Sequence, residues 1–272
     1  MITLALIRDT FREALARRIF LALFGFSTLM LLFFLFIMKI DVVEGALATV
    51  SLFGWEGRAQ EVSQVVRNTY AGVSAFLYGI GMFLAAFASA GLIPTIFEPG
   101  RIELLLSKPV SRAHILIGRY LGNLAVITAN VIFLSVGIWV IFGYKTGIWP
   151  PEFLFAVGLT IFGFATLLTV ILLVAVLSES AVLSTIATFG LMTIGTIVAQ
   201  QSLLERLLNA EWARSVVRVL YAILPKIWDL GNINRKLVNG IAVEDWSPLW
   251  STAGFGAVVF ALAVFCFQRR NY

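Results

Sequence analysis

Six long runs of uncharged, mostly apolar residues constrain this chain more than any other feature of its sequence. A helix rises about 1.5 Å per residue and a bilayer core is about 30 Å thick, so about 20 apolar residues can cross it. The runs lack the short alternating pattern of barrel strands. The sequence therefore predicts an all-α polytopic membrane protein. Its six transmembrane helices are expected at residues 19–40, 70–97, 115–143, 153–178, 180–203 and 247–268.

Composition excludes a soluble globular protein. Hydrophobic residues make up 60% of the chain and charged residues 13%, with a mean hydropathy of +0.95. A soluble domain of 272 residues needs more charge to cover its surface. The net charge of +5 does not indicate nucleic-acid binding, because the basic residues are not gathered in one stripe with aromatic residues between them. We expect a single transmembrane domain over residues 1–272.

The first 18 residues have the pattern of an amphipathic helix. Leu4, Ile7 and Phe11 recur at helical spacing, while Arg8 and Arg12 belong to the opposite, charged face. We expect residues 1–18 to form a helix in the membrane interface. The alternative is a basic flank that only orients the first span. The apolar run that follows exceeds the roughly 7–15 residues of a secretory signal, so we interpret it as a span.

The distribution of charge predicts the topology. With the amino terminus in the cytoplasm, the inner segments hold ten basic and five acidic residues, whereas the outer segments hold equal numbers of each. The positive-inside rule therefore places both termini in the cytoplasm. Residues 204–246 would then lie outside, where their mixed apolar and charged spacing, broken at Pro225, predicts an amphipathic helical cover on the membrane. A separate soluble subdomain is the alternative, but the segment is short for a core.

The spans carry few groups that perform chemistry. The chain has a single histidine, His114, a single cysteine, Cys266, and no GxxxxGK[ST] phosphate loop. We therefore expect no catalytic residue, no metal site and no cofactor bound by this chain. Thr185, Thr188 and Thr196 share an arc of roughly 80° on the fifth span and could line a pathway. Threonines in membrane helices more often bond to their own backbone or to a neighbouring helix.

Residues 98–114 form a charged interruption between the second and third spans. Pro99 and Gly100 end one helix, about two helical turns follow, and Lys108 with Pro109 stop them. Ser111 is a suitable N-cap for the third span. A short amphipathic helix fixed between two breakers at the cytoplasmic surface is suited to transmit a push from a soluble partner. We call residues 98–114 the coupling segment.

The coupling segment resembles the cytoplasmic motif of ABC-2 type transporter permeases. That motif has an acidic residue, a glycine, an ELLL-like run, a proline, an arginine and a Gly-Lys or Gly-Arg pair. Here they are Glu98, Gly100, Glu103 with Leu104 to Leu106, Pro109, Arg112 and Gly118 with Arg119. The general plan of spans and interfacial helices is also similar. The branch it resembles most holds the copper-processing permease of nitrous oxide reductase maturation and sodium or multidrug export permeases. This sequence departs from the pattern of that branch at Arg101, where Thr is commoner, and at Arg119, where Lys is common.

The resemblance implies the transmembrane half of an exporter in the bacterial cytoplasmic membrane. Two such permease subunits, identical or different, would work with two ATPase subunits that bind ATP and Mg²⁺. The permease subunits would contact membrane lipid, and a periplasmic or other accessory protein could join the complex. The second and fifth spans would line the route. The residues expected to contact the ATPase are Glu98, Gly100, Arg101, Glu103, Leu104, Lys108, Pro109 and Arg112.

Two other functions stay open at the level of sequence. An ATP-independent secondary transporter or channel would also have six spans, although such proteins usually carry intramembrane charges or broken helices. A non-transporting anchor could use the coupling segment to hold a soluble partner. A pathway lined by threonine, serine and aromatic side chains favours lipids, amphipathic drugs or peptides over a bare ion.

Overall fold

The computed structural model describes residues 8–13, 16, 18–43, 47–52, 55–56, 60–91, 93–94, 111–208 and 210–270. Within these ranges, six helical stretches are long and apolar enough to cross a membrane, which confirms the polytopic helical class. They are Phe20–Ile37, Val62–Ala90, Arg112–Thr146, Pro151–Ser178, Ala181–Val198 and Ser247–Arg269.

The first two spans each contain a π-helical stretch. The first span joins α2 (Arg18–Leu32) to the π-helix η1 (Phe33–Ile37). The second joins α3 (Val62–Phe76), the π-helix η2 (Leu77–Gly81) and α4 (Met82–Ala90). Such stretches often mark functional positions, because the extra residue interrupts the regular hydrogen-bond ladder.

The remaining spans are uninterrupted helices. The third is α6 (Arg112–Thr146), the fourth α7 (Pro151–Ser178), the fifth α8 (Ala181–Val198) and the sixth α12 (Ser247–Arg269). The predicted cap at Ser111 is confirmed, since its hydroxyl accepts from the His114 amide at 3.4 Å. Gly147 ends α6 in the left-handed conformation (φ 73°) that glycine adopts without strain.

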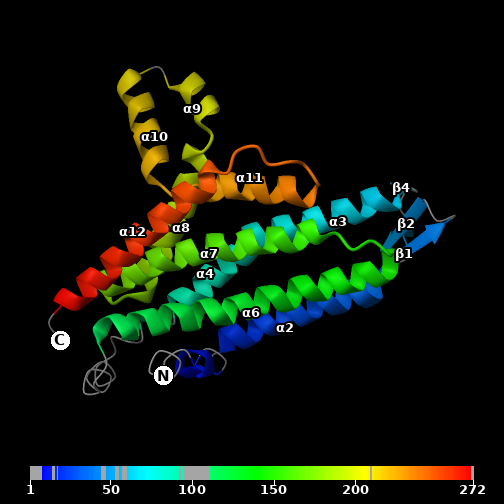
Figure 1. Cartoon of the computed structure of the whole chain (residues 1–272), viewed down its shortest axis with the longest axis horizontal. Coiled ribbons are helices and arrows are strands. Elements are labelled where there is room, and N and C mark those ends of the chain that lie inside the picture. Colours follow the sequence, from blue (N-terminus) through cyan, green and yellow to red (C-terminus); the bar gives the residue numbers. More distant parts are fainter. Residues whose placement is uncertain are drawn as a thin grey trace.

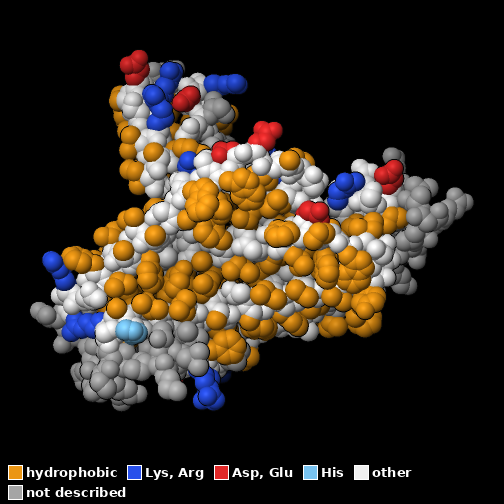
Figure 2. Space-filling model, in the orientation of Figure 1, with side chains coloured by type: hydrophobic (Ala, Val, Ile, Leu, Met, Phe, Trp, Pro, Cys, Tyr) orange, Lys and Arg blue, Asp and Glu red, His pale blue; other side chains and the backbone are white. Residues whose placement is uncertain are grey.

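Helix α7 forms the centre of the bundle. In its spanning window 72% of the residues are buried, against 17% in the first and fifth spans. It packs against α4, α6, α8 and α12. Figure 1 shows α7 running between these helices. The outer helices expose large apolar side chains, which form the broad belt in Figure 2 with charged side chains gathered at its borders. This pattern is the one expected of a bundle surrounded by lipid.

A small antiparallel sheet connects the first two spans. Its strands are β1 (Met38–Val43), β2 (Leu47–Leu52), β3 (Trp55–Glu56) and β4 (Gln60–Glu61). In β1 and β2, Met38 pairs with Leu52 and Val43 with Leu47. The sequence analysis predicts only an outer segment between these spans. The sheet forms because β1 and β2 are rich in β-branched residues, which suit a pleated strand.

The segment between the fifth and sixth spans contains three helices with different surroundings. They are α9 (Gln201–Leu207), α10 (Glu211–Ile223) and α11 (Ile227–Val238). Helix α10 buries none of its residues and stands away from the bundle, as Figure 1 shows. Helix α11 instead packs on α3 and α7 and buries Leu230 and Ile233. The predicted surface cover stays a prediction for α10, whereas α11 belongs to the packed bundle.

Candidate functional site

Most of the predicted ATPase contacts cannot be placed. Glu98, Gly100, Arg101, Glu103, Leu104, Lys108 and Pro109 lie outside the described residues. The structure does describe Ser111 and the first turns of α6, where the coupling segment leads into the third span, together with the elements that pack against them. These surroundings define a candidate coupling end of the bundle.

Arg112, the first residue of α6, binds the end of α12. Its Nη1 donates to the carbonyl oxygens of Gln268 at 3.4 Å and Phe267 at 3.5 Å, and also to that of Arg270. The last carbonyls of a helix have no partner within the helix and carry partial negative charge, so a guanidinium is favourable there. Arg112 thus connects the coupling segment to the sixth span. Its predicted contact with an ATPase stays a prediction.

Arg270 extends this connection to the turn between α7 and α8. Its Nη2 lies 3.0 Å from Oε1 of Glu179, and its Nη1 donates to the carbonyl of Val176. Glu179 ends α7 in the left-handed conformation, with φ at 52°. The fourth, fifth and sixth spans are therefore joined at the end of the bundle where α6 begins.

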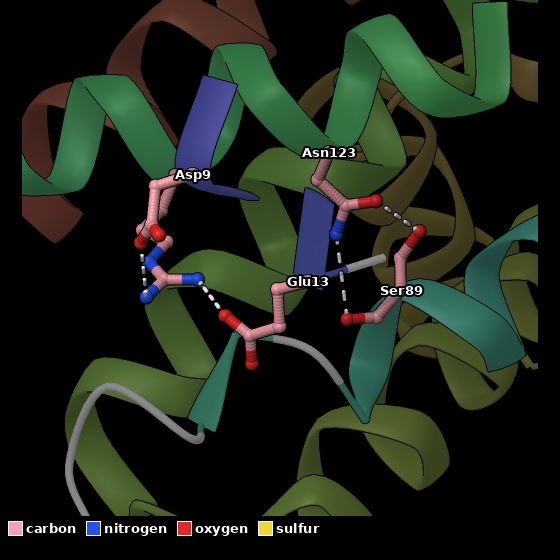
Figure 3. A network of polar contacts seen from close by, with 5 residues as sticks. Asp9, Glu13, Ser89 and Asn123 are labelled. Atoms are coloured by element: carbon pink, nitrogen blue, oxygen red, sulfur yellow. Dashed lines mark hydrogen bonds and ion pairs between the residues drawn. The ribbon is translucent and has the colours of Figure 1, made fainter. Parts of the chain in front are cut away.

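Arg119 binds the amino-terminal helical segment, residues 8–13. Its side chain is 2% exposed, with Nη1 at 2.5 Å from Oε2 of Glu13 and Nη2 at 3.8 Å from Oδ2 of Asp9 (Figure 3). The Glu13 side chain is 17% exposed and that of Asp9 63%. A buried guanidinium persists only when it is paired. This pair fixes the amino-terminal segment against α6.

Gly122, nearly one helical turn after Arg119, allows the close approach. A Cβ atom on Gly122 would lie 2.5 Å from Cβ of Thr10, which is itself buried. The sequence analysis assigned Arg119 to the family motif and did not identify its acidic partners. The spacing of Asp9 and Glu13, one turn apart, was the available signal.

The second and third spans are joined on the bundle side of the coupling segment. The hydroxyl of Ser89 in α4 donates to Oδ1 of Asn123 in α6 at 2.9 Å, and both side chains are buried (Figure 3). Asn123 Nδ2 returns a bond to the Ser89 carbonyl at 3.5 Å. Further along α6, Asn130 donates to the hydroxyl of Ser27 in the first span at 3.1 Å. The start of α6 is thus bonded to helices on several sides.

A groove runs between the second and fifth spans. One hollow of about 600 Å³ is lined on one side by Gly79, Ile80 and Phe83 and on the other by Phe189, Met192 and Thr196.

A second hollow of about 410 Å³ lies further along the same two helices. It is lined by Phe87 and Gly91 and by Val182, Thr185 and Ile186. In the lining of the first hollow, the rings of Phe83 and Phe189 stack with centroids 3.9 Å apart and an interplanar angle of 14°. We call the two hollows together the α4–α8 groove.

The three threonines of the predicted pathway bond to their own helix. Thr185, Thr188 and Thr196 each donate to the carbonyl four residues earlier, at 2.8 Å. Thr185 and Thr196 line the α4–α8 groove, whereas Thr188 is 1% exposed. The hydroxyl protons of the two groove threonines are therefore committed to backbone carbonyls. Their role in a pathway stays a prediction.

The middle of the second span contacts helix α11. The Tyr78 hydroxyl in η2 donates to the carbonyl of Ile227 at 2.5 Å, and a Cβ on Gly231 would lie 2.8 Å from the Tyr78 ring. One turn earlier in α3, Ser74 donates to Oδ1 of Asn234 at 2.7 Å. The second span therefore contacts α11 near the same π-helical stretch whose Gly79 lines the groove.

A polar joint connects α10 to α11. The Tyr221 hydroxyl donates to Oδ2 of Asp229 at 2.8 Å, and Lys226 lies over the Tyr221 ring. Burial, and then the hydrogen bond to Asp229, raise the pKa of Tyr221 to about 12, so the phenol keeps its proton and acts as the donor. Across the part of the chain that the structure describes, no three His, Cys, Asp or Glu residues lie close enough to hold a metal ion.

Comparison with known proteins identifies the chain at the level of family. A family model described as ABC-2 family transporter protein matches residues 4–272. No curated protein matches the chain in sequence. The match extends over the amino-terminal segment, all six spans and α9 to α11, and so includes both the coupling end and the α4–α8 groove.

Proposed function

Because the chain belongs to the ABC-2 transporter family, we propose that this membrane permease is the transmembrane subunit of an exporter, driven by two separate ATPase subunits. The ATPases would dock on the coupling segment from the cytoplasm, and a second permease subunit would complete the complex. The bacterial cytoplasmic membrane is the expected location, with both termini inside. Contacts of described residues near both ends of the chain support a shared side, because Arg112 of α6 bonds to the end of α12 and Arg119 of α6 pairs with Glu13.

The convergence of contacts on the start of α6 carries this proposal. Within residues 112–123, Arg112 binds the end of α12, Arg119 the amino-terminal segment, and Asn123 the second span. Arg112 belongs to the coupling segment, and Arg119 and Asn123 follow it in α6. A force applied there would reach several spans without a long relay of side chains, as a coupled transporter requires.

The α4–α8 groove is the proposed route for substrate. The described second and fifth spans meet along it, as the family resemblance implies. Among the described residues, none that lines the two hollows is ionisable, and the stacked rings of Phe83 and Phe189 line the first. These surroundings suit an uncharged or amphipathic molecule with an apolar part better than a bare ion, which needs oxygen ligands or charge.

Removing the acidic residue of the ELLL-like run is expected to uncouple the complex. In vesicles that contain the permease and its ATPase, Glu103→Ala should lower transport per ATP hydrolysed by about tenfold, within the usual range of coupling between sites. Arg112→Ala should uncouple to a similar degree and also lower thermal stability, because it releases the end of α12. ATP hydrolysis and efflux are measured on the same vesicles.

Glu205→Ala on the exposed surface of α9 is the matched control and should leave coupling unchanged. Normal coupling in the Glu103→Ala, Arg112→Ala double variant would contradict docking at this segment. Transport without any ATPase would favour a secondary transporter, and co-purification of a soluble partner without transport would favour an anchor.

Replacing Phe83 or Phe189 by alanine, which removes one ring of the stack, is expected to weaken substrate binding. Burial of a phenylalanine side chain is worth about 1.5–3 kcal/mol, so each alanine variant should raise the half-maximal concentration for stimulation of ATPase activity by about tenfold or more. The measurement uses a panel of lipophilic dyes. Phe155→Ala is the control, since Phe155 is 71% exposed on α7 and lines neither hollow of the groove. Equal effects of Phe155→Ala and Phe189→Ala would place the route elsewhere.

A further inference from the structure

The amino-terminal helical segment, residues 8–13, separates its charged side chains by face. At about 100° per residue, Arg8 and Arg12 lie within roughly 40° of each other, on the side of the helix away from Thr10. Both arginines are exposed, whereas Thr10 is buried against Gly122. Arg18, at the start of α2, is exposed as well.

The acidic residues of this segment point toward the bundle. Glu13 is mostly buried and pairs with Arg119, and Asp9 lies 3.8 Å from the same guanidinium (Figure 3). Arg119 comes from α6, so Glu13 forms its ion pair across to the bundle, on the side of the segment away from Arg8 and Arg12. Arg8 and Arg12, together with the exposed Arg18 that follows them at the start of α2, are called the arginine face.

The arginine face lies close to the lipid headgroups, because it leads directly into the first span. Helix α2 begins at Arg18, and its spanning window begins at Phe20. The segment that leads into a spanning helix must lie close to the level of the lipid headgroups. From Leu21 onward α2 exposes apolar side chains, with Leu21 at 55% and Leu29 at 65%, so the arginine face continues directly into a lipid-facing surface.

We propose that the arginine face binds the headgroups of anionic phospholipids in the leaflet on the side of the termini. Exposed arginines next to a membrane attract anionic lipid, and the phosphate group accepts their hydrogen bonds. Bound lipid would hold the amino-terminal segment in place, and Arg119 would pass this restraint to α6. The lipid composition of the leaflet would thereby adjust the coupling end. This property goes beyond transport itself and does not require an ATPase.

The test measures which lipids surround the segment in the full-length permease. A fluorophore is attached to Ala16→Cys, an exposed position, in a Cys266→Ser background. The protein is placed in nanodiscs of phosphatidylcholine with phosphatidylglycerol, either lipid carrying a headgroup quencher. Quenching by phosphatidylglycerol should exceed quenching by phosphatidylcholine by at least about threefold at low salt, below the roughly fivefold per arginine that the surface potential allows. High salt should reduce the preference.

The variant Arg8→Gln, Arg12→Gln, Arg18→Gln should lose the preference, to a ratio of about one. The control Arg206→Gln, Arg218→Gln, Arg235→Gln removes the same charge from exposed positions in the segment between the fifth and sixth spans and should keep it. Thermal unfolding of both variants verifies that they are folded.

A preference unchanged in the Arg8, Arg12, Arg18 variant would overturn the proposal. If that variant instead loses co-purification with the ATPase, the arginine face binds the ATPase and not lipid. Because no ATPase is present in the lipid assay, its result is independent of whether the chain transports.

Discussion

Arg119→Met is expected to lower the free energy of unfolding by about 3 kcal/mol. Removal of one partner from a buried ion pair typically costs about 3–5 kcal/mol, because the other charge stays buried without compensation. We expect the lower end of this range, since Glu13 retains 17% of its exposure and can be partly hydrated. The loss should appear as a shifted midpoint in denaturant titrations of the reconstituted permease.

A second variant separates the ion pair from simple loss of packing. Arg119→Met combined with Glu13→Met should recover much of the lost stability, because apolar replacement of a whole buried pair is often close to neutral. Asp9→Asn should cost less than about 1 kcal/mol, since its carboxylate is 63% exposed and 3.8 Å away. If Arg119→Met unfolds at the midpoint of the wild type, Arg119 does not hold the amino-terminal segment as the structure shows.

Asn234→Asp is expected to destabilise the protein by about 3 kcal/mol or more, well beyond the effect of Asn234→Leu. Asn234 is 1% exposed, its Oδ1 accepts from Ser74 at 2.7 Å, and its Nδ2 donates to Thr160 at 2.9 Å. Neither partner carries a positive charge, so a carboxylate there would be buried without compensation. The leucine variant should cost only about 1–2 kcal/mol, because Thr160 keeps its bond to the Ala156 carbonyl at 3.2 Å.

The two variants should also differ in their dependence on pH. Burial raises the pKa of an aspartate above its unfolded value of about 3.9, so the folded aspartate variant is favoured where the carboxyl is protonated. Its stability should therefore fall as pH rises from about 4 toward 7, while that of the leucine variant should not follow this trend. Denaturation midpoints at several pH values give the comparison. Equal behaviour of the two variants would mean that position 234 is hydrated and that α11 is not docked on the second span.

The six spans could be predicted because transfer into a bilayer depends on the length and polarity of each segment by itself. The same holds for the cap at Ser111, which depends on a hydroxyl next to the first helical turn. The coupling segment was predicted from its own breakers and motif and stays a prediction, because residues 98–110 lie outside the described residues. Each of these features is encoded in a short stretch of sequence, so it needs no knowledge of what lies across the bundle.

Contacts between distant residues could not be predicted in this way. The pairing of Arg119 with Glu13 joins residues 106 positions apart, and that of Asn234 with Ser74 joins residues 160 apart. In an apolar helix nearly every face is acceptable to lipid, so periodicity does not reveal which face meets a neighbouring helix. The small sheet was not predicted, because each of its strands is stabilised by pairing with another strand and not by its own residues alone.

The sequence by itself determined that this chain has six segments able to span a membrane and which segment resembles a coupling motif. It did not determine every boundary, since the second span begins at Val62 and not at the predicted residue 70. Only the tertiary structure decided that Arg112 binds the end of α12, that Arg119 is buried with acidic partners, and that the second and fifth spans enclose a groove. The physical reason is that hydrophobicity acts on segments, whereas ion pairs, hydrogen bonds and cavities depend on how the segments pack.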